Sequence, residues 1–98
     1  MIVLEFLKDK EDLDFINDQI GMDSEIEIFE VDSVGLEAMI QVVIPVTAIL
    51  APVVSSILSK VLDGKRVTIK YKDIEISAGS YEDAKKILDD IVHIKNEN

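Results

Sequence analysis

The acidic side chains are the first candidates for chemistry, because carboxylates a few residues apart can bind Ca²⁺. The stretch DLDFIND has the apolar Phe15 and Ile16 in the part that should supply the later ligand and the turn glycine of a calcium loop. The stretch DSEIEI has Ile28 in place of that glycine. Asp14 and Asp18 would be neighbours on a helix, but solvated acids share this spacing. We therefore expect no metal site.

Groups for nucleophilic or phosphate chemistry are also missing from the sequence. His93 is the single histidine, and it falls in the last turn of a predicted helix, where binding carbonyl groups is its ordinary role. The chain has no cysteine, and each of its glycines stands alone at the end of a predicted element. We expect neither an enzyme nor a bound cofactor.

The main feature of the rest of the sequence is a long apolar stretch in the middle of the chain. Residues 38–59 carry no charge, although 31% of the chain is charged and 48% is hydrophobic. This composition is typical of one globular domain, 1–98. Residues 1–37 hold twelve acids against Lys8 and Lys10, whereas acids and bases balance in the rest of the chain. The first 37 residues therefore account for the whole net charge of −10. An acidic surface repels phosphate, so we expect no nucleic-acid partner.

The first part of the chain predicts strand, helix, strand. Residues 2–7 are a short apolar run, which is typical of a central strand. Residues 10–20 have helical spacing and end at Gly21. Residues 24–31 alternate as a strand, but Phe29 and Val31 have the opposite parity to Ile26 and Ile28. This change indicates either a bulge or a strand with both faces covered.

The last part predicts a hairpin and a helix. Residues 66–72 and 73–78 alternate between apolar and polar side chains, which predicts that Ile69 and Ile76 are buried, and the two runs meet at Lys72 and Asp73. Ser80 and Asp83 have the spacing of a capping box before an amphipathic helix. We therefore predict an α/β (α+β) fold with a small mixed four-stranded sheet. Its elements follow in the order strand, helix, strand, long helix, strand, strand, helix, with a parallel first pair and helices packed on the sheet.

We interpret residues 34–63 as a long apolar helical segment with a cap at Ser33. In the alternative interpretation, the helix breaks at Pro45 or Pro52 and folds back as two helices. Unbroken, this helix would be about 45 Å long, against a diameter of roughly 35 Å for a domain of this size. Both prolines fall on one stripe of small or polar residues, so the carbonyls of Gln41 and Ala48 would be free for water or a partner.

The segment is long enough to cross a membrane, but a spanning helix would divide the domain into two pieces that are each too small to fold alone. We therefore favour burial or assembly over membrane insertion. The predicted interaction residues are Met39, Val42, Val43, Val46, Ile49, Leu50, Val53, Val54 and Ile57.

The final pattern, SSILSKVLDGKRVTIKYKDIEISAGSYEDAKKILDDI, combines an apolar helix, a basic hairpin and a capped helix. It resembles the effector-associated constant component family of bacterial conflict systems. The resemblance implies a small non-enzymatic adaptor that couples sensing or effector modules encoded nearby, and it brings no functional residues to this chain.

These observations favour a cytoplasmic adaptor or interaction module that binds a protein partner or forms a homo-oligomer through the apolar segment. The first alternative is a small membrane-associated protein with one transmembrane helix. The second alternative is an acidic decoy that binds a basic partner.

Overall fold

The computed structural model describes residues 1–21, 25–32 and 37–96. Within them, the strands are β1 (Ile2–Leu7), β2 (Glu27–Asp32), β3 (Ala38–Ile44), β4 (Val67–Tyr71) and β5 (Ile74–Ala78). The helices are α1 (Lys10–Ile20), the 3₁₀ helix η1 (Val46–Ala48), α2 (Pro52–Val61) and α3 (Tyr81–Asn96). The α+β class predicted from the sequence is confirmed.

The strands form one sheet in the order β2-β3-β1-β4-β5, and every neighbouring pair is antiparallel. β1 lies at the centre, as predicted. The predictions of four strands and of a parallel first pair are wrong. The reason is β3, which the sequence reading placed in a helix and which separates β1 from β2 in the sheet.

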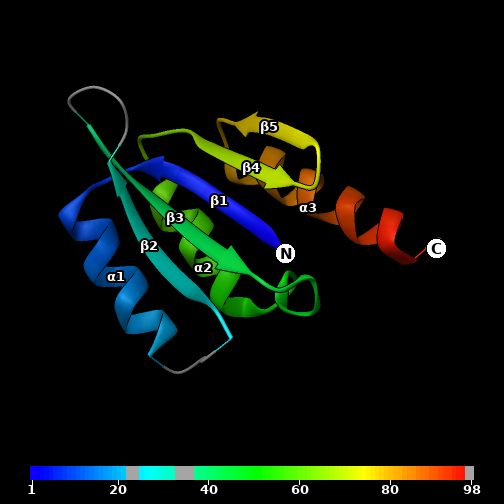
Figure 1. Cartoon of the computed structure of the whole chain (residues 1–98), viewed down its shortest axis with the longest axis horizontal. Coiled ribbons are helices and arrows are strands. Elements are labelled where there is room, and N and C mark those ends of the chain that lie inside the picture. The colour runs from blue at the N-terminus through cyan, green and yellow to red at the C-terminus, as the bar shows by residue number, and fades with distance from the viewer. Residues whose placement is uncertain (22–24, 33–36, 97–98) are drawn as a thin grey trace.

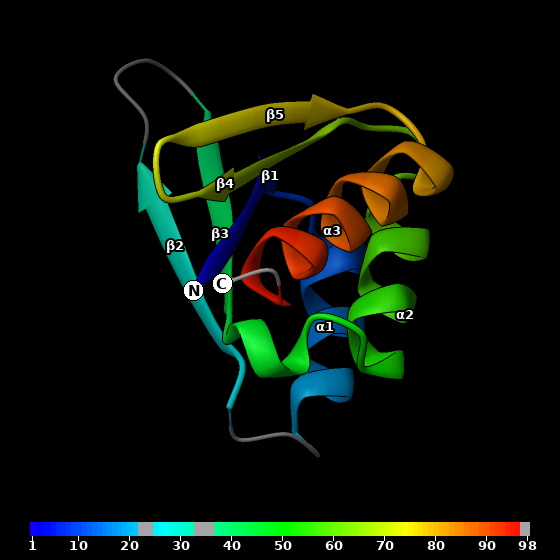
Figure 2. The same cartoon turned by 90° about the vertical axis from the view of Figure 1, so that its right-hand side faces the viewer.

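All three α-helices of the described chain lie on one side of this twisted sheet. Figure 1 looks onto the opposite side, with the strands in front of the helices, and Figure 2 shows the two layers edge-on. The strand side chains that face the helices provide ten of the 21 buried hydrophobic residues of the described core. They are Ile2, Leu4, Phe6, Ile40, Val42, Ile44, Val67, Ile69, Tyr71 and Ala78, all buried.

The segment predicted as a long helix is divided between three elements. Residues 38–44 are the strand β3, followed by η1, and only residues 52–61 form α2. The prediction of a continuous helix is therefore wrong for the first part of the segment. The predicted cap at Ser33 and residues 34–36 lie outside the described residues.

The two prolines begin helical elements and do not interrupt one. Pro45 caps η1 with an extended backbone, and Pro52 occupies the first turn of α2, where a missing N–H costs almost nothing. Gln41 lies within β3, and the carbonyl of Ala48 accepts a hydrogen bond from the N–H of Ala51 at 3.1 Å. The expectation of two free carbonyls on a helical stripe is therefore wrong.

The C-terminal prediction is largely confirmed. β4 and β5 form the expected hairpin, with Lys72 at a φ of 53° in its turn. The N–H of Asp83 donates to Ser80 Oγ at 3.2 Å, as the capping-box spacing indicated. The predicted burial of Ile76 is wrong, because β5 is an edge strand that the helix layer covers incompletely.

An ion pair links α1 to the chain before β4. Asp12 is buried, and its carboxylate lies 2.5 Å from the ammonium of Lys65. Asp9 caps α1 by accepting hydrogen bonds from the N–H groups of Glu11 and Asp12. The bond from Asp12, with further contributions from Lys65 and from the Glu11 bond, lowers the pKa of the Asp9 carboxyl, although partial desolvation opposes this. The acidic start of this helix therefore has a structural role.

Candidate functional site

The sheet face that looks away from the helices is the first candidate surface, because none of the described helices covers it (Figure 2). The strand register places its side chains in rows across the sheet. One row runs Glu27, Val43, Val3, Lys70, Glu75, and the next runs Phe29, Gln41, Glu5, Thr68, Ser77. A third row, of Val31, Met39 and Leu7, is apolar throughout.

Apolar side chains gather at the β2-β3-β1 end of this face. We define the sheet patch as Val3, Leu7, Phe29, Val31, Met39 and Val43. Phe29 is 47% exposed, Leu7 is 41% exposed and Val31 is 38% exposed, while the others are half-buried among their neighbours. Exposed apolar side chains that are contiguous in this way mark interaction surfaces more often than isolated ones do.

A polar cluster lies next to the sheet patch at the centre of the face. Glu5 Oε2 accepts hydrogen bonds from Gln41 Nε2 at 2.8 Å and from Lys70 Nζ at 3.2 Å. The bond from Gln41 and then the bond and charge of Lys70 lower the pKa of the Glu5 carboxyl, although partial burial opposes them. The cluster is internally satisfied, so it borders the patch without needing an outside ligand.

The charge of this face differs from that of the whole chain. Its strand positions in the described residues carry Glu5, Glu27 and Glu75 against Lys70, and Arg66 extends over it to donate to Ser77 Oγ at 3.1 Å. The face therefore has almost balanced charge in a chain of net charge −10. A partner can approach it without strong repulsion.

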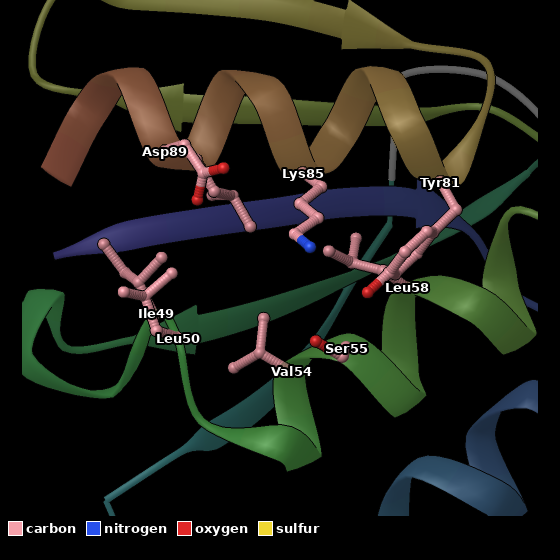
Figure 3. Close-up of a pocket in the computed structure, with 9 residues that line it drawn as sticks. Ile49, Leu50, Val54, Ser55, Leu58, Tyr81, Lys85 and Asp89 are labelled. Atoms are coloured by element: carbon pink, nitrogen blue, oxygen red, sulfur yellow. The ribbon is translucent and has the colours of Figure 1, made fainter. Parts of the chain in front are cut away.

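A groove between α2 and α3 is the second candidate surface (Figure 3). Its volume is about 170 Å³, and a cavity of about 150 Å³ is large enough for a benzene ring. Its apolar lining consists of Ile49, Leu50, Val54, Leu58 and Leu88. The groove can therefore accept one large apolar side chain.

Polar groups of the groove come mainly from α3. Tyr81, Lys85 and Asp89 project from it, and Ser55 faces them from α2 (Figure 3). A shallower hollow between α1 and α2 is lined by Phe15, Ser59 and Lys60, among others. In the part of the chain that the structure describes, no three His, Cys, Asp or Glu side chains are grouped to hold a metal ion.

The predicted interaction residues are separated by the fold. Met39 and Val43 lie on the uncovered face, whereas Val42 points into the core from the same strand. Val54 and Ile57 are buried on α2.

The remaining predicted residues lie around η1 and the start of α2. Leu50 is 64% exposed at the groove, Ile49 is buried beside it, and Val46 and Val53 are half-buried. The structure thus leaves two groups of the predicted residues accessible, one on the sheet and one beside the groove.

Sequence reasoning missed the contribution of Leu7, Phe29 and Val31. The available signal is the parity change in residues 24–31, which predicts either a bulge or a strand with both faces covered. The pairing of β2 with β3 is continuous from Glu27 to Asp32, so there is no bulge, and the second face of β2 is apolar and exposed. The change of parity therefore marks apolar residues on both faces of the strand.

Comparison of the chain with family models, curated proteins and solved structures found no match. Across residues 1–21, 25–32 and 37–96, no helix is both long and apolar enough to cross a bilayer. Residues 38–59, which suggested such a helix, comprise β3, η1 and most of α2.

Proposed function

We propose that this chain is a non-enzymatic adaptor that docks a protein partner through the sheet patch. The observation that carries the proposal is the contrast on a single sheet between a face covered by helices and a face with three exposed apolar side chains. Hydrophobic burial drives most protein association, and three of the seven exposed large hydrophobic side chains in the described chain lie together on this face.

The size of the face limits the affinity. Five strands about 4.8 Å apart, each about 17–24 Å long, give a flat footprint of about 400–500 Å². Standard interfaces bury about 800 Å² on each partner. The partner must therefore also contact the loops around the face, or the complex is reversible, as is common for adaptors.

The partner should present apolar side chains to the sheet patch and polar groups to the cluster of Glu5, Gln41 and Lys70. The resemblance to the conflict-system family suggests that this partner is an effector encoded by a neighbouring gene. The salt dependence of binding distinguishes the adaptor from the acidic decoy. A decoy would bind its basic partner through carboxylates, so its affinity would fall steeply as the salt concentration rises.

Co-expression with the products of the flanking genes tests the proposal. A tagged wild-type chain should co-purify one of them, and Phe29→Glu should abolish recovery by placing a charge in the patch. Leu50→Glu is the matched control, since it charges an exposed apolar residue beside the groove. Equal recovery with both variants would contradict docking at the sheet patch, and loss with Leu50→Glu alone would assign docking to the groove.

A further inference from the structure

The outer edge of β5 lacks the features that usually protect an edge strand. Among the described residues, β5 pairs only with β4 and ends the sheet. Natural edge strands avoid pairing with other chains by carrying lysine, proline, bulges or several charges. β5 has the sequence IEISA, without lysine or proline, and Glu75 is its one charged residue. Its edge is therefore available to another strand.

The opposite edge of the sheet differs strongly in charge. β2 has the sequence EIFEVD, with three acids in six residues. Lys8 neutralises one of them, through a 2.7 Å ion pair with Glu30. Pairing of β2 with β2 of a second copy would bring these acids together, so the charges of β2 oppose self-association at that edge.

Apolar side chains flank the free edge of β5 on its helix side. Ile76 is 41% exposed and Ile74 is 37% exposed, although both point to the same side of the sheet as the core residues Ile69 and Tyr71. α3 contacts β5 but leaves these two side chains partly in water. An added strand would cover them, because it would extend the same layer.

The backbone of β5 is oriented for such an addition. Tyr71 and Ile74 flank the two-residue hairpin turn and pair with each other. In a two-residue hairpin, the residues that flank the turn form a hydrogen-bonded pair, and along an antiparallel ladder the direction of the backbone groups then alternates. The N–H and C=O groups of Glu75 and Ser77 consequently point away from β4, toward the free edge.

One register satisfies both the backbone and the side chains. If β5 pairs antiparallel with β5 of a second copy about Ile76, each Glu75 lies opposite Ser77 of the second copy. The outward backbone groups then meet, and the two Ile76 side chains pack together on the helix side. A shift that paired Glu75 with itself would place like charges opposite each other.

Charge complementarity favours the same register. Arg66 Nε donates to Ser77 Oγ at 3.1 Å, so the Arg66 guanidinium lies beside Ser77. In the proposed register, Glu75 of the second copy lies opposite Ser77 and therefore close to this guanidinium. Glu75 has no ion-pair partner within the described chain. We propose that this protein forms a two-fold symmetric dimer through its β5 edges, with reciprocal Glu75–Arg66 contacts and one sheet continuous across both copies.

The dimer should be weak and reversible. Two paired strands of five residues bury far less than a standard interface, so we expect a dissociation constant on the order of 10–1000 µM. Both uncovered faces would lie on the same side of the continuous sheet. Two sheet patches would then be presented together, which raises the effective affinity for a partner that has two binding sites and can contact both patches at once.

Sedimentation velocity from about 10 µM to about 1 mM tests the dimer directly. The wild type should shift from monomer toward dimer, and Ile76→Lys should weaken association at least tenfold. Val31→Lys, which places the same charge on an exposed residue of the other edge, should leave it unchanged. A wild type that stays monomeric throughout, or a dimer lost in Val31→Lys and kept in Ile76→Lys, would overturn the proposal.

Charge exchange and hydrogen exchange provide tests that do not depend on the folding of the lysine variant. Glu75→Arg and Arg66→Glu should each weaken dimerisation, and the double variant should restore it. In the wild type, the amide protons of Glu75 and Ser77 should become protected as concentration rises. Unchanged protection, or a double variant as weak as the single variants, would contradict this register.

The proposed dimer and the proposed adaptor function can be tested independently of each other. Ile76→Lys interrupts the β5 edge and leaves the sheet patch intact, whereas Phe29→Glu does the reverse. A protein that dimerises but binds no partner would contradict the proposed function alone. A monomer whose partner binding depends on Phe29 would contradict only the β5 dimer.

Discussion

The two faces of the sheet use similar residues in opposite ways. Phe6 on β1 points toward the helices and is 1% exposed, whereas Phe29 on β2 points away from them and is 47% exposed. Both are phenylalanines in strands of six residues. The difference shows that the position of the helices, and not the residue type, decides which apolar side chains form the core and which remain available for a partner.

The largest expected difference comes from truncating these two phenylalanines. Phe6→Ala should lower the free energy of unfolding by about 3–5 kcal/mol, because it leaves a cavity in the core. Phe29→Ala should lower it by less than about 1 kcal/mol, since that ring is half in water. Urea denaturation followed by circular dichroism would measure both. Similar losses for the two variants would mean that the uncovered face is buried in solution.

The next largest effect on stability is expected from carboxylates, which should contribute differently on the two sides of the sheet. Asp12, buried on the helix side, pairs with Lys65, so Asp12→Ala should destabilise the fold by about 1–3 kcal/mol by leaving an ammonium group without its partner. The charge is partly shielded, as Lys65 also lies 3.7 Å from Asp9. Thermal unfolding would measure this loss, and Asp14→Ala on the same helix is the control. Equal melting temperatures for the two variants would contradict a structural role for the ion pair.

Glu5 on the uncovered face should give a smaller, pH-dependent effect. Its pKa is lowered in the folded state, so it contributes stability above the pKa of about 4.3 that it has when unfolded. That contribution is lost as the pH falls through the lower folded pKa. We expect Glu5→Gln to cost about 1 kcal/mol or less at pH 7 and to remove this part of the acid dependence. NMR titration of the Glu5 side-chain carboxyl would check the direction, and a raised pKa would refute it.

The smallest expected effect is that of proline replacement in the segment that links the two layers. Pro52→Ala should change the free energy of unfolding by less than about 0.5 kcal/mol, because the first turn of a helix needs no N–H from this residue. Chemical denaturation at fixed temperature is the measurement. Marked stabilisation would instead indicate that Pro52 interrupts a longer helix, as the sequence first suggested.

The sequence pattern was most informative where polar and apolar residues alternate clearly. The capped helix after Ser80 and the hairpin at Lys72 were predicted because turn and cap residues separate them from their neighbours. β3 could not be predicted in this way, since an apolar run without charges has the same appearance in a buried strand and a buried helix. The β-branched residues Val42, Val43 and Ile44 before Pro45 were the available signal for a strand that ends at a proline.

The candidate site was predictable only in part for a related reason. Met39 and Val43 were identified through the apolar segment, but they join Phe29 and Leu7 only through the strand order β2-β3-β1. Strand order depends on contacts between distant segments, which local periodicity does not contain. Ile76 shows the same limit from the other side, because its alternation predicted burial and its place at the sheet edge exposes it.

The most direct test of docking at the uncovered face is a calorimetric titration of the purified flanking-gene product into the wild type, Phe29→Glu and Leu50→Glu. The melting temperatures of the three proteins are compared first, so that binding is measured on folded chains. We predict binding at least tenfold weaker for Phe29→Glu and unchanged for Leu50→Glu. Equal affinity for the wild type and Phe29→Glu would contradict the assignment of the sheet patch as the docking surface.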